Sequence, residues 1–174
     1  AAKLDNDAMD ALQGATLAYD GSAKAISYEG IVDAIDLFEE EVNTEKVMFI
    51  HPKQVTVLRK DSNFISADKY QAGVMVSGEI GMIANTRIVP SKKVPVVKVG
   101  TSTQVDCYAC PIVKLEQDAE TEDEIPALTI YLKRDTNVET ERKPKNRTTE
   151  ITADKFYTVA LSNEAKVVLA KFKK

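Results

Sequence analysis

The strongest constraint in this sequence is the run of residues 149–162, "TEITADKFYTVALS", in which apolar and polar side chains alternate. Successive side chains of a strand point to opposite faces, so this alternation predicts a strand with one buried face. The apolar residues of that face are Ile151, Ala153, Tyr157, Val159 and Leu161. The segment "SNEA" then leads into "KVVLAKF", residues 166–172. Together these segments predict a long antiparallel hairpin with one buried face.

Two more strand-like runs, "PIVKL" and "ALTIYLKR", precede this region and make the second half of the chain β-rich. Residues 116–126 between them are acidic and predict an exposed loop, and residues 141–150 form a second polar segment that is basic. Both segments can be solvated loops that keep the protein soluble, or they can be complementary contacts between identical neighbouring chains. In the second interpretation the contacting residues are Glu122, Asp123, Glu124, Arg142, Lys145 and Arg147.

The first half of the chain predicts helices. Residues 1–18 show a helical spacing of apolar side chains, and no capping residue precedes them. We therefore expect a helix entered in its middle, and a chain that is a fragment or processed product of a longer protein.

A second helix is predicted in "SYEGIVDAIDLFEEEV", where apolar residues recur at three- and four-residue steps and Ser27 is the expected N-cap. The carboxylates spaced along the opposite side are typical of a solvated face rather than of a metal or acid–base site. Three glutamates, Glu39 to Glu41, crowd the C-terminal end, where the helix macrodipole disfavours negative charge. We expect a basic partner for this end, which can lie on another chain.

The lone histidine, His51, lies between a short buried strand, Val47 to Ile50, and Pro52, which suits the first turn of a helix. A catalytic role would need a nucleophile or a carboxylate fixed beside the imidazole, and the sequence indicates none. We expect a structural histidine that caps the helix or packs under it.

The segment "GEIGMIANTRIVPS", residues 78–91, raises the possibility of a phosphate-binding loop. It matches neither the P-loop pattern nor the dinucleotide-binding pattern, because it lacks the required lysine and the third glycine. Asn85 readily adopts the left-handed backbone conformation of a turn. We interpret Gly78, Gly81 and Asn85 as a structural turn that leads into a strand.

The two cysteines, Cys107 and Cys110, form a C-x-x-C pattern in "QVDCYACPIVKL". This run is β-branched and reads as extended, and residues three apart on a strand point to opposite faces. A zinc site would need two more ligands from a chain that has one histidine and no other cysteine. We expect two free thiols, with no catalytic site, metal or cofactor.

Charge and hydropathy argue against two further classes of protein, those that bind nucleic acid and those that span membranes. The net charge is -4 and the sequence pI is near 5.2, which argues against a broad basic surface that binds nucleic acid. No apolar run approaches the roughly 20 residues that a membrane-spanning helix needs. Sequence-specific nucleic-acid binding and membrane insertion are therefore not expected.

The order of these segments resembles the C-terminal portion of a tailed-bacteriophage major capsid protein with the Hong Kong-type fold, an α+β fold. The resemblance covers nearly the whole chain and is most specific in residues 47–64, "VMFIHPKQVTVLRKDSNF", and 78–94, "GEIGMIANTRIVPSKKV". It implies a mixed α/β axial domain and a peripheral β hairpin packed with the end of a spine helix. The implied boundaries are 1–21 for the end of the spine helix, 22–138 for the axial domain and 139–174 for the return strands of the peripheral domain.

The same resemblance implies a function. The chain is then part of a shell protein of the virion, without enzymatic activity, assembled in the bacterial cytoplasm into pentamers and hexamers that enclose the genome. Its N-terminal arm and extended loop are missing, and scaffolding and portal proteins are possible partners. Two other classes stay open, namely another phage structural module or surface adhesin, and a small redox or nucleotide-dependent enzyme.

Overall fold

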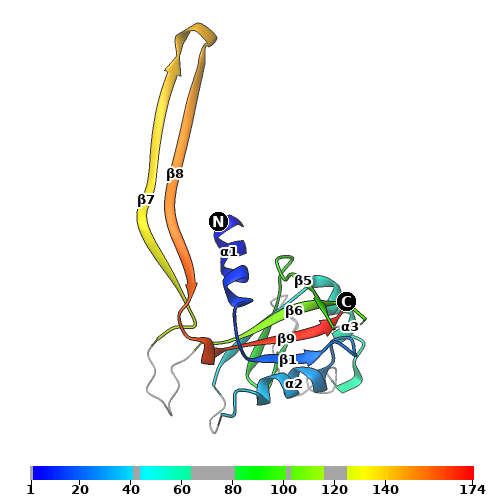
Figure 1. The fold of residues 1–174 in the computed structure, drawn as a ribbon. Helices are drawn as coiled ribbons and strands as arrows, with labels where there is room; N and C mark the ends of the chain where they lie inside the picture. The colour runs from blue at the N-terminus through cyan, green and yellow to red at the C-terminus, as the bar shows by residue number, and fades with distance from the viewer. Residues whose placement is uncertain (1, 41–43, 64–80, 101–102, 116–124) are drawn as a thin grey trace.

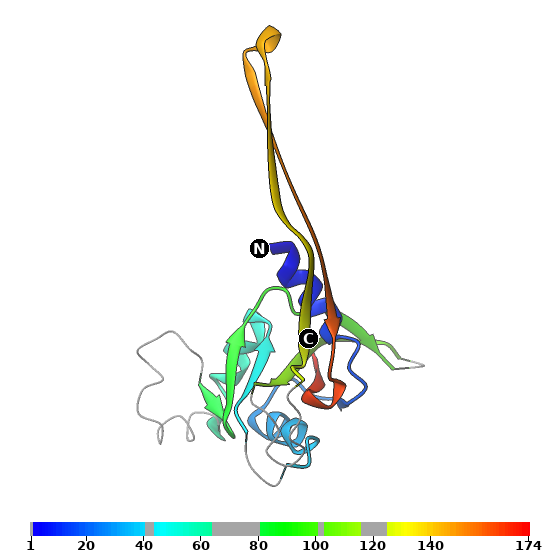
Figure 2. The same cartoon turned by 90° about the vertical axis from the view of Figure 1, so that its left-hand side faces the viewer.

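The computed structural model describes residues 2–40, 44–63, 81–100, 103–115 and 125–174. The chain forms a body built on a mixed β-sheet, and a long two-stranded hairpin rises from that body (Figure 1). Turned by 90°, the hairpin is seen as a thin ribbon that extends well beyond all other described elements (Figure 2). Helices and strands occur together, as expected for an α+β fold.

The body contains a seven-stranded sheet in the order β1-β9-β6-β2-β4-β3, with β5 paired to β6. Its strands are β1 (Ala18–Gly21), β2 (Lys46–Ile50), β3 (Met82–Ile83), β4 (Thr86–Pro90), β5 (Val96–Val99), β6 (Val105–Lys114) and β9 (Val167–Lys173). The β1–β9 and β2–β4 pairs are parallel, and the others are antiparallel. The two halves of the sheet meet where β2 pairs with β6.

Helix α2 (Tyr28–Asp36) contacts β1, β9 and β3 in the sheet. Of its apolar stripe, Ile31 and Ile35 are buried, and Tyr28 and Val32 are partly buried. Ser27 is the N-cap, and its hydroxyl accepts a hydrogen bond of 3.2 Å from the Gly30 N–H, which confirms the predicted cap. A Cβ atom at Gly30 would lie 2.9 Å from the Phe172 ring, so this glycine lets α2 approach β9 closely.

His51 serves the structure at the corner between β2 and α3 (Pro52–Leu58). Its Nδ1 accepts a hydrogen bond from the Lys53 N–H, and the His51 N–H donates to the Gln54 side chain. The imidazole also stacks on the Tyr108 ring, with the ring centroids 4.6 Å apart. The expectation of a histidine that caps the helix is confirmed.

The predicted hairpin partner was wrong. Strand β8 (Thr148–Leu161) pairs with β7 (Leu128–Lys143), whereas β9 lies between β1 and β6 in the large sheet. The physical reason is burial: four successive residues of β9, Val167 to Ala170, are buried, which is typical of an interior strand covered on both faces. Between β8 and β9, "SNEA" forms a 3₁₀ turn, η2 (Glu164–Lys166), capped by Asn163.

This pairing also changes how the expected domains map onto the chain. The boundary expected at residue 139 falls inside β7, and residues 167–173 belong to the sheet of the body. The basic segment 141–150, for which a solvated loop and a contact between identical chains were both considered, contains the ends of both hairpin strands and the 3₁₀ turn η1 (Pro144–Asn146) at the tip. If the chain is divided by strand pairing, residues 128–161 form one unit, the hairpin of β7 and β8.

A two-residue turn joins β3 to β4, and both of its residues have positive φ, 45° at Ala84 and 58° at Asn85. This is the backbone of a type I′ turn, which matches the twist of the strands it joins. Gly81 precedes the turn with φ 140°, a conformation expected of a glycine that serves backbone geometry, and its carbonyl accepts from the Ile88 N–H at 3.2 Å. Gly78 lies outside the described residues.

Substitutions at Asn85 will show whether backbone conformation determines the stability of this turn. Asn85→Ala should lower the free energy of unfolding by about 1 kcal/mol, because alanine pays the steric cost of the left-handed region. Asn85→Gly should be close to neutral, because glycine adopts positive φ freely. Chemical denaturation of both variants measures the difference, and equal losses in the two variants would contradict a backbone role.

Candidate assembly interface

The hairpin has two faces that differ in composition. Cross-strand partners share a face, so the pairing register assigns each residue. The helix-side face is mainly apolar and consists of Leu128, Ile130, Leu132, Val138, Thr140 and Arg142 on β7 with Leu161, Val159, Tyr157, Ala153, Ile151 and Thr149 on β8. The opposite face consists of Thr129, Tyr131, Arg134, Asn137, Glu139, Glu141 and Lys143 with Ala160, Thr158, Phe156, Asp154, Thr152, Glu150 and Thr148.

Helix α1 (Ala2–Leu12) covers only the base of the helix-side face. The Tyr157 hydroxyl donates a 2.7 Å hydrogen bond to Asp7 of α1, and Met9 and Leu12 are buried beside an apolar cavity of about 330 Å³ that Leu128 also lines. Toward the tip the face is open, with Val138 57% and Ile151 69% exposed. The predicted alternation on β8 is present, but its predicted buried face is only partly buried near the base, at Tyr157, Val159 and Leu161, and is exposed toward the tip.

The tip of the hairpin carries the basic residues of the predicted charged contact. Arg142, Lys145 and Arg147 are all exposed, and Arg147 closes the tip with φ 50°. The proposed acidic partners Glu122, Asp123 and Glu124 lie outside the described residues. The three basic residues of the predicted contact are therefore located at the exposed tip. The contact with the acidic residues stays a prediction.

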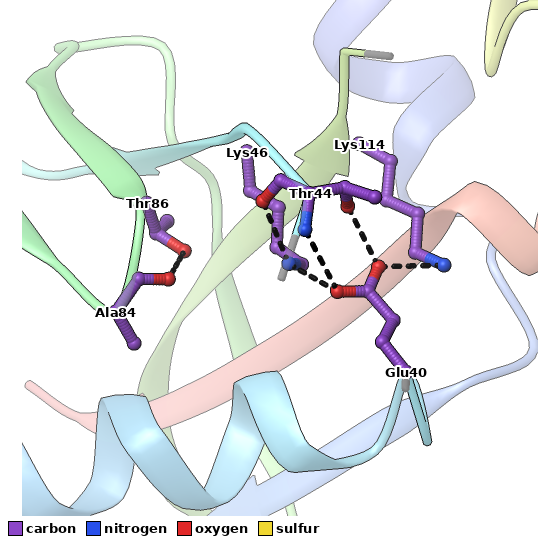
Figure 3. A network of polar contacts seen from close by, with 6 residues as sticks. All are labelled: Glu40, Thr44, Lys46, Ala84, Thr86 and Lys114. Carbon is purple, nitrogen blue, oxygen red and sulfur yellow. Dashed lines mark hydrogen bonds and ion pairs between the residues drawn. The ribbon is translucent and has the colours of Figure 1, made fainter. Parts of the chain in front are cut away.

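Below the hairpin, a buried charge cluster holds the two halves of the sheet together (Figure 3). Lys46 of β2 and Lys114 of β6 are direct cross-strand partners, and their side chains are 0% and 5% exposed. Like charges in such positions repel, but Glu40 lies between them: its Oε2 contacts the Lys46 Nζ and its Oε1 is 2.7 Å from the Lys114 Nζ. The Phe38 ring lies 5.7 Å and 5.1 Å from the same two ammonium groups.

The backbone after α2 brings Glu40 into this position. Glu39 has φ 50°, a left-handed conformation that is common just after the end of a helix, and the Thr44 hydroxyl donates a 2.8 Å hydrogen bond to Glu40. Burial by itself raises the pKa of Glu40, but the hydrogen bonds from Lys114, Lys46 and Thr44 outweigh it and hold the pKa below its usual value. The acidic helix end thus finds its basic partners on its own chain.

Sequence reasoning missed this cluster because its members come from three elements. The only local signal was the row of glutamates after α2, which called for a basic partner without identifying it. Lys46 is next to a strand predicted to begin at Val47, and nothing in the sequence pairs it with Lys114.

The residues considered for catalysis are not arranged for it. Cys107 and Cys110 are free, as expected, and both are fully buried. The Cys110 thiol donates to Gln54 at 3.2 Å, and burial raises its pKa to about 12, so it does not ionise near neutral pH. No cluster of metal-ligating side chains is found in the described part of the chain, and none of its helices is long and apolar enough to cross a membrane.

Neutralising Glu40 tests the charge cluster. Glu40→Gln should lower the free energy of unfolding by about 3 kcal/mol at pH 7, because it removes the negative charge that contacts both buried ammonium groups. The pKa of Glu40 is lowered on folding, so the stabilisation is complete above the unfolded pKa, near 4.5, and is lost as pH falls through the folded pKa. The difference between wild type and variant should therefore shrink below pH 4.5, as denaturation at several pH values will measure.

The matched control is Glu29→Gln on the exposed face of α2, which should change stability by less than about 0.5 kcal/mol at any pH. A Glu40→Gln variant as stable as this control would show that the cluster does not stabilise the sheet.

Comparisons with known proteins identify proteins that are similar to this chain in sequence and in fold. No family model matches the sequence. The chain is 30% identical over 168 residues to the major capsid protein of Staphylococcus phage phiMR11, covering 95% of this chain and 53% of that protein. The chain therefore spans about half the length of this relative.

Solved structures share the fold at low sequence identity. The capsid of Helicobacter pylori bacteriophage KHP30 matches with a TM-score of 0.70 and 12% identity over 99% of this chain and 64% of its own. The SrpI encapsulin of Synechococcus elongatus PCC 7942 matches with a TM-score of 0.58 and 8% identity over 98% of this chain and 61% of its own. The chain thus has the Hong Kong-type fold of phage capsid proteins and is related in sequence to a phage major capsid protein.

Proposed function

We propose that the chain is a portion of the major capsid protein of a tailed bacteriophage or prophage, and that copies of the whole protein form the pentamers and hexamers of a shell that encloses the genome. The observation that carries this proposal is the 30% identity to the phiMR11 major capsid protein, spread over 95% of the chain. The fold alone would also fit an encapsulin, so the sequence relative favours a phage shell.

The arrangement of elements fits a subunit whose parts have separate roles. In this proposal the seven-stranded body is the axial domain, and the hairpin with α1 is the peripheral domain. The N-terminal end of α1 points along the hairpin toward its tip (Figure 1), and the helix-side face carries the exposed apolar residues Val138 and Ile151 farther toward the tip. A longer helix preceding α1 in the whole protein would bury Val138 and Ile151, which supports the reading of α1 as the end of a spine helix.

The function is structural rather than catalytic in this proposal. Its residues act by packing and charge, and the buried thiols and the capping histidine take no chemical role. Assembly takes place in the bacterial cytoplasm, where scaffolding and portal proteins are the further partners to be expected of such a shell.

Charge at the hairpin tip supports a finer proposal about contacts between neighbours. Arg142, Lys145 and Arg147 are exposed at the end of a long lever, where they cannot reach the body of their own chain's sheet. The acidic residues Glu122, Asp123 and Glu124 of a neighbouring copy are the proposed partners. Exposed ion pairs contribute only about 0–1 kcal/mol each, so these contacts would set register and choice of partner more than affinity.

Shell formation tests the proposed function directly. The whole protein, with the residues that precede this chain, should assemble into closed particles visible by electron microscopy and sedimenting far faster than a subunit. The 174-residue chain alone should remain monomeric or weakly associated in physiological salt by analytical ultracentrifugation. Absence of particles from the whole protein, with its scaffolding protein supplied, would contradict the proposal.

Charge exchange tests the proposed contact in the whole protein. Reversal of Glu122, Asp123 and Glu124 to lysine should impair shell formation, because basic tips would then meet basic loops. Adding Arg142→Glu and Lys145→Glu should restore it. Unchanged assembly in the first variant would show that both segments are solvated surfaces kept charged for solubility.

A further inference from the structure

The exposed surface of helix α3 is basic. The exposed positions of the helix and of the two residues that follow it are Lys53, Thr56, Val57, Arg59 and Lys60. Three of these residues are basic and none is acidic. Residues seven apart lie on the same side of a helix, so Lys53 and Lys60 share one stripe. The chain as a whole has a net charge of -4, so this concentration of positive charge is local.

The carboxylate that follows this helix does not neutralise it. Asp61 accepts a 2.8 Å hydrogen bond from the Tyr28 N–H through one oxygen and a 3.0 Å hydrogen bond from the Asn63 N–H through the other. These bonds direct the carboxylate to backbone groups, one of them at the start of α2. Asp61 forms no ion pair within the described part of the chain.

The end of β9 adds Lys174 to the same surface. His51 stacks on the Tyr108 ring, and Tyr108 is the cross-strand partner of Phe172. Side chains two apart on a strand point to the same face, so Lys174 follows Phe172 toward the imidazole. In Figure 1 the C-terminal end lies beside α3, far from the tip of the hairpin.

Lys92 extends this surface from the segment after β4. The Ser91 N–H donates a 2.8 Å hydrogen bond to the last carbonyl of β2, which places the next residue, Lys92, near His51. Burial lowers the pKa of His51, and the positive charges of Lys53, Lys174 and Lys92 lower it further. The three lysines therefore act on one imidazole, although they come from three separate segments.

These residues form what we call the α3 basic surface: Lys53, Arg59, Lys60, Lys92 and Lys174. All five are exposed, and none forms an ion pair with a described residue. Other basic residues of the body are paired with carboxylates, namely Lys46, Arg87, Lys93 and Lys114. A cluster of positive charges without countercharges attracts anions and raises their local concentration.

Nucleic-acid backbone is the anion that fits both this surface and the proposed function. Lysine and arginine bind nucleic acid by neutralising its phosphates, and these contacts carry no sequence information. A shell that encloses a genome keeps its subunits next to this polyanion. Elsewhere the chain has an excess of carboxylates, so contact with phosphates is favoured at this surface.

We propose that the α3 basic surface binds phosphate groups of the nucleic-acid backbone enclosed by the shell, without sequence preference. The inference rests on the proposed shell function and adds the side of the subunit that meets the genome. Each subunit contributes a weak contact, and the shell repeats it in every copy. The hairpin tip is a separate basic segment and has no part in this contact.

Salt dependence of DNA binding tests this surface. Dissociated subunits of the whole protein should bind a fluorescently labelled DNA duplex of arbitrary sequence, as measured by fluorescence anisotropy. Five phosphate contacts predict roughly 500-fold weaker binding at about 200 mM salt than at about 50 mM. The triple variant Lys53→Gln, Arg59→Gln, Lys60→Gln should bind at least tenfold more weakly at the lower salt concentration. It should also reduce the slope of log affinity against log salt by about 3.

The matched control removes three positive charges elsewhere. Lys24→Gln, Lys133→Gln and Lys155→Gln change exposed lysines outside the α3 basic surface, and Lys24 lines a hollow with Asp20 and Glu29. This control should keep the affinity and the salt slope of wild type. Both triple variants should keep the thermal unfolding midpoint within a few degrees of wild type.

The results that would overturn the inference are distinct from those that test the shell. Wild-type binding by the α3 variant, or equal losses in both triple variants, would overturn it and leave the shell function intact. An α3 variant that binds DNA normally but fails to assemble would also overturn it, and would indicate a contact with another subunit. Inorganic phosphate should compete no better than chloride at the same ionic strength; stronger competition would indicate a site for free phosphate and overturn the backbone contact. Failure of the unmodified protein to form shells would instead overturn the proposed function.

Discussion

The body depends on a short joint between β2 and β6. Only three cross-strand pairs join them, and one places Lys46 directly opposite Lys114 with both side chains buried. Glu40 contacts both ammonium groups, so its negative charge offsets the repulsion between two buried positive charges on directly paired residues. The Glu40 carboxylate and the Phe38 ring stabilise the two buried ammonium groups, and the Thr44 hydroxyl holds the carboxylate. These contacts allow β2 and β6 to pair, and this pairing joins the two halves of the sheet.

Features fixed by neighbouring residues could be predicted from the sequence. The Ser27 cap, the His51–Pro52 corner and the alternation along β8 each depend on a few residues close together in the chain, and each is present. Strand pairing is different, because "KVVLAKF" and "ALTIYLKR" are equally suited to lie beside β8 when only local patterns are considered. The continuous burial of β9 decides the matter, and that burial exists only after the sheet has formed.

The same limit applies to the candidate site. The basic residues of the tip could be identified as exposed, but the two faces of the hairpin depend on the register between β7 and β8 and on two irregularities within β7. A one-residue change of register would exchange the faces and place Tyr131 with the apolar residues that α1 covers. The buried lysines were unpredictable for a related reason, since Glu40 and Lys114 are distant in sequence and lysine is rarely buried.

An extended hairpin without a core of its own leaves apolar side chains in water in an isolated subunit. In the proposed shell the same side chains are available for contacts with other chain segments. Ile130, Leu132, Val138 and Ile151 lie on one face, and Tyr131 and Phe156 on the other, all at least half exposed. Burial of these side chains by other chain segments would add hydrophobic stabilisation, which fits the shell subunit proposed above. Because the two faces differ in composition, a subunit of the proposed shell would bind different surfaces through them.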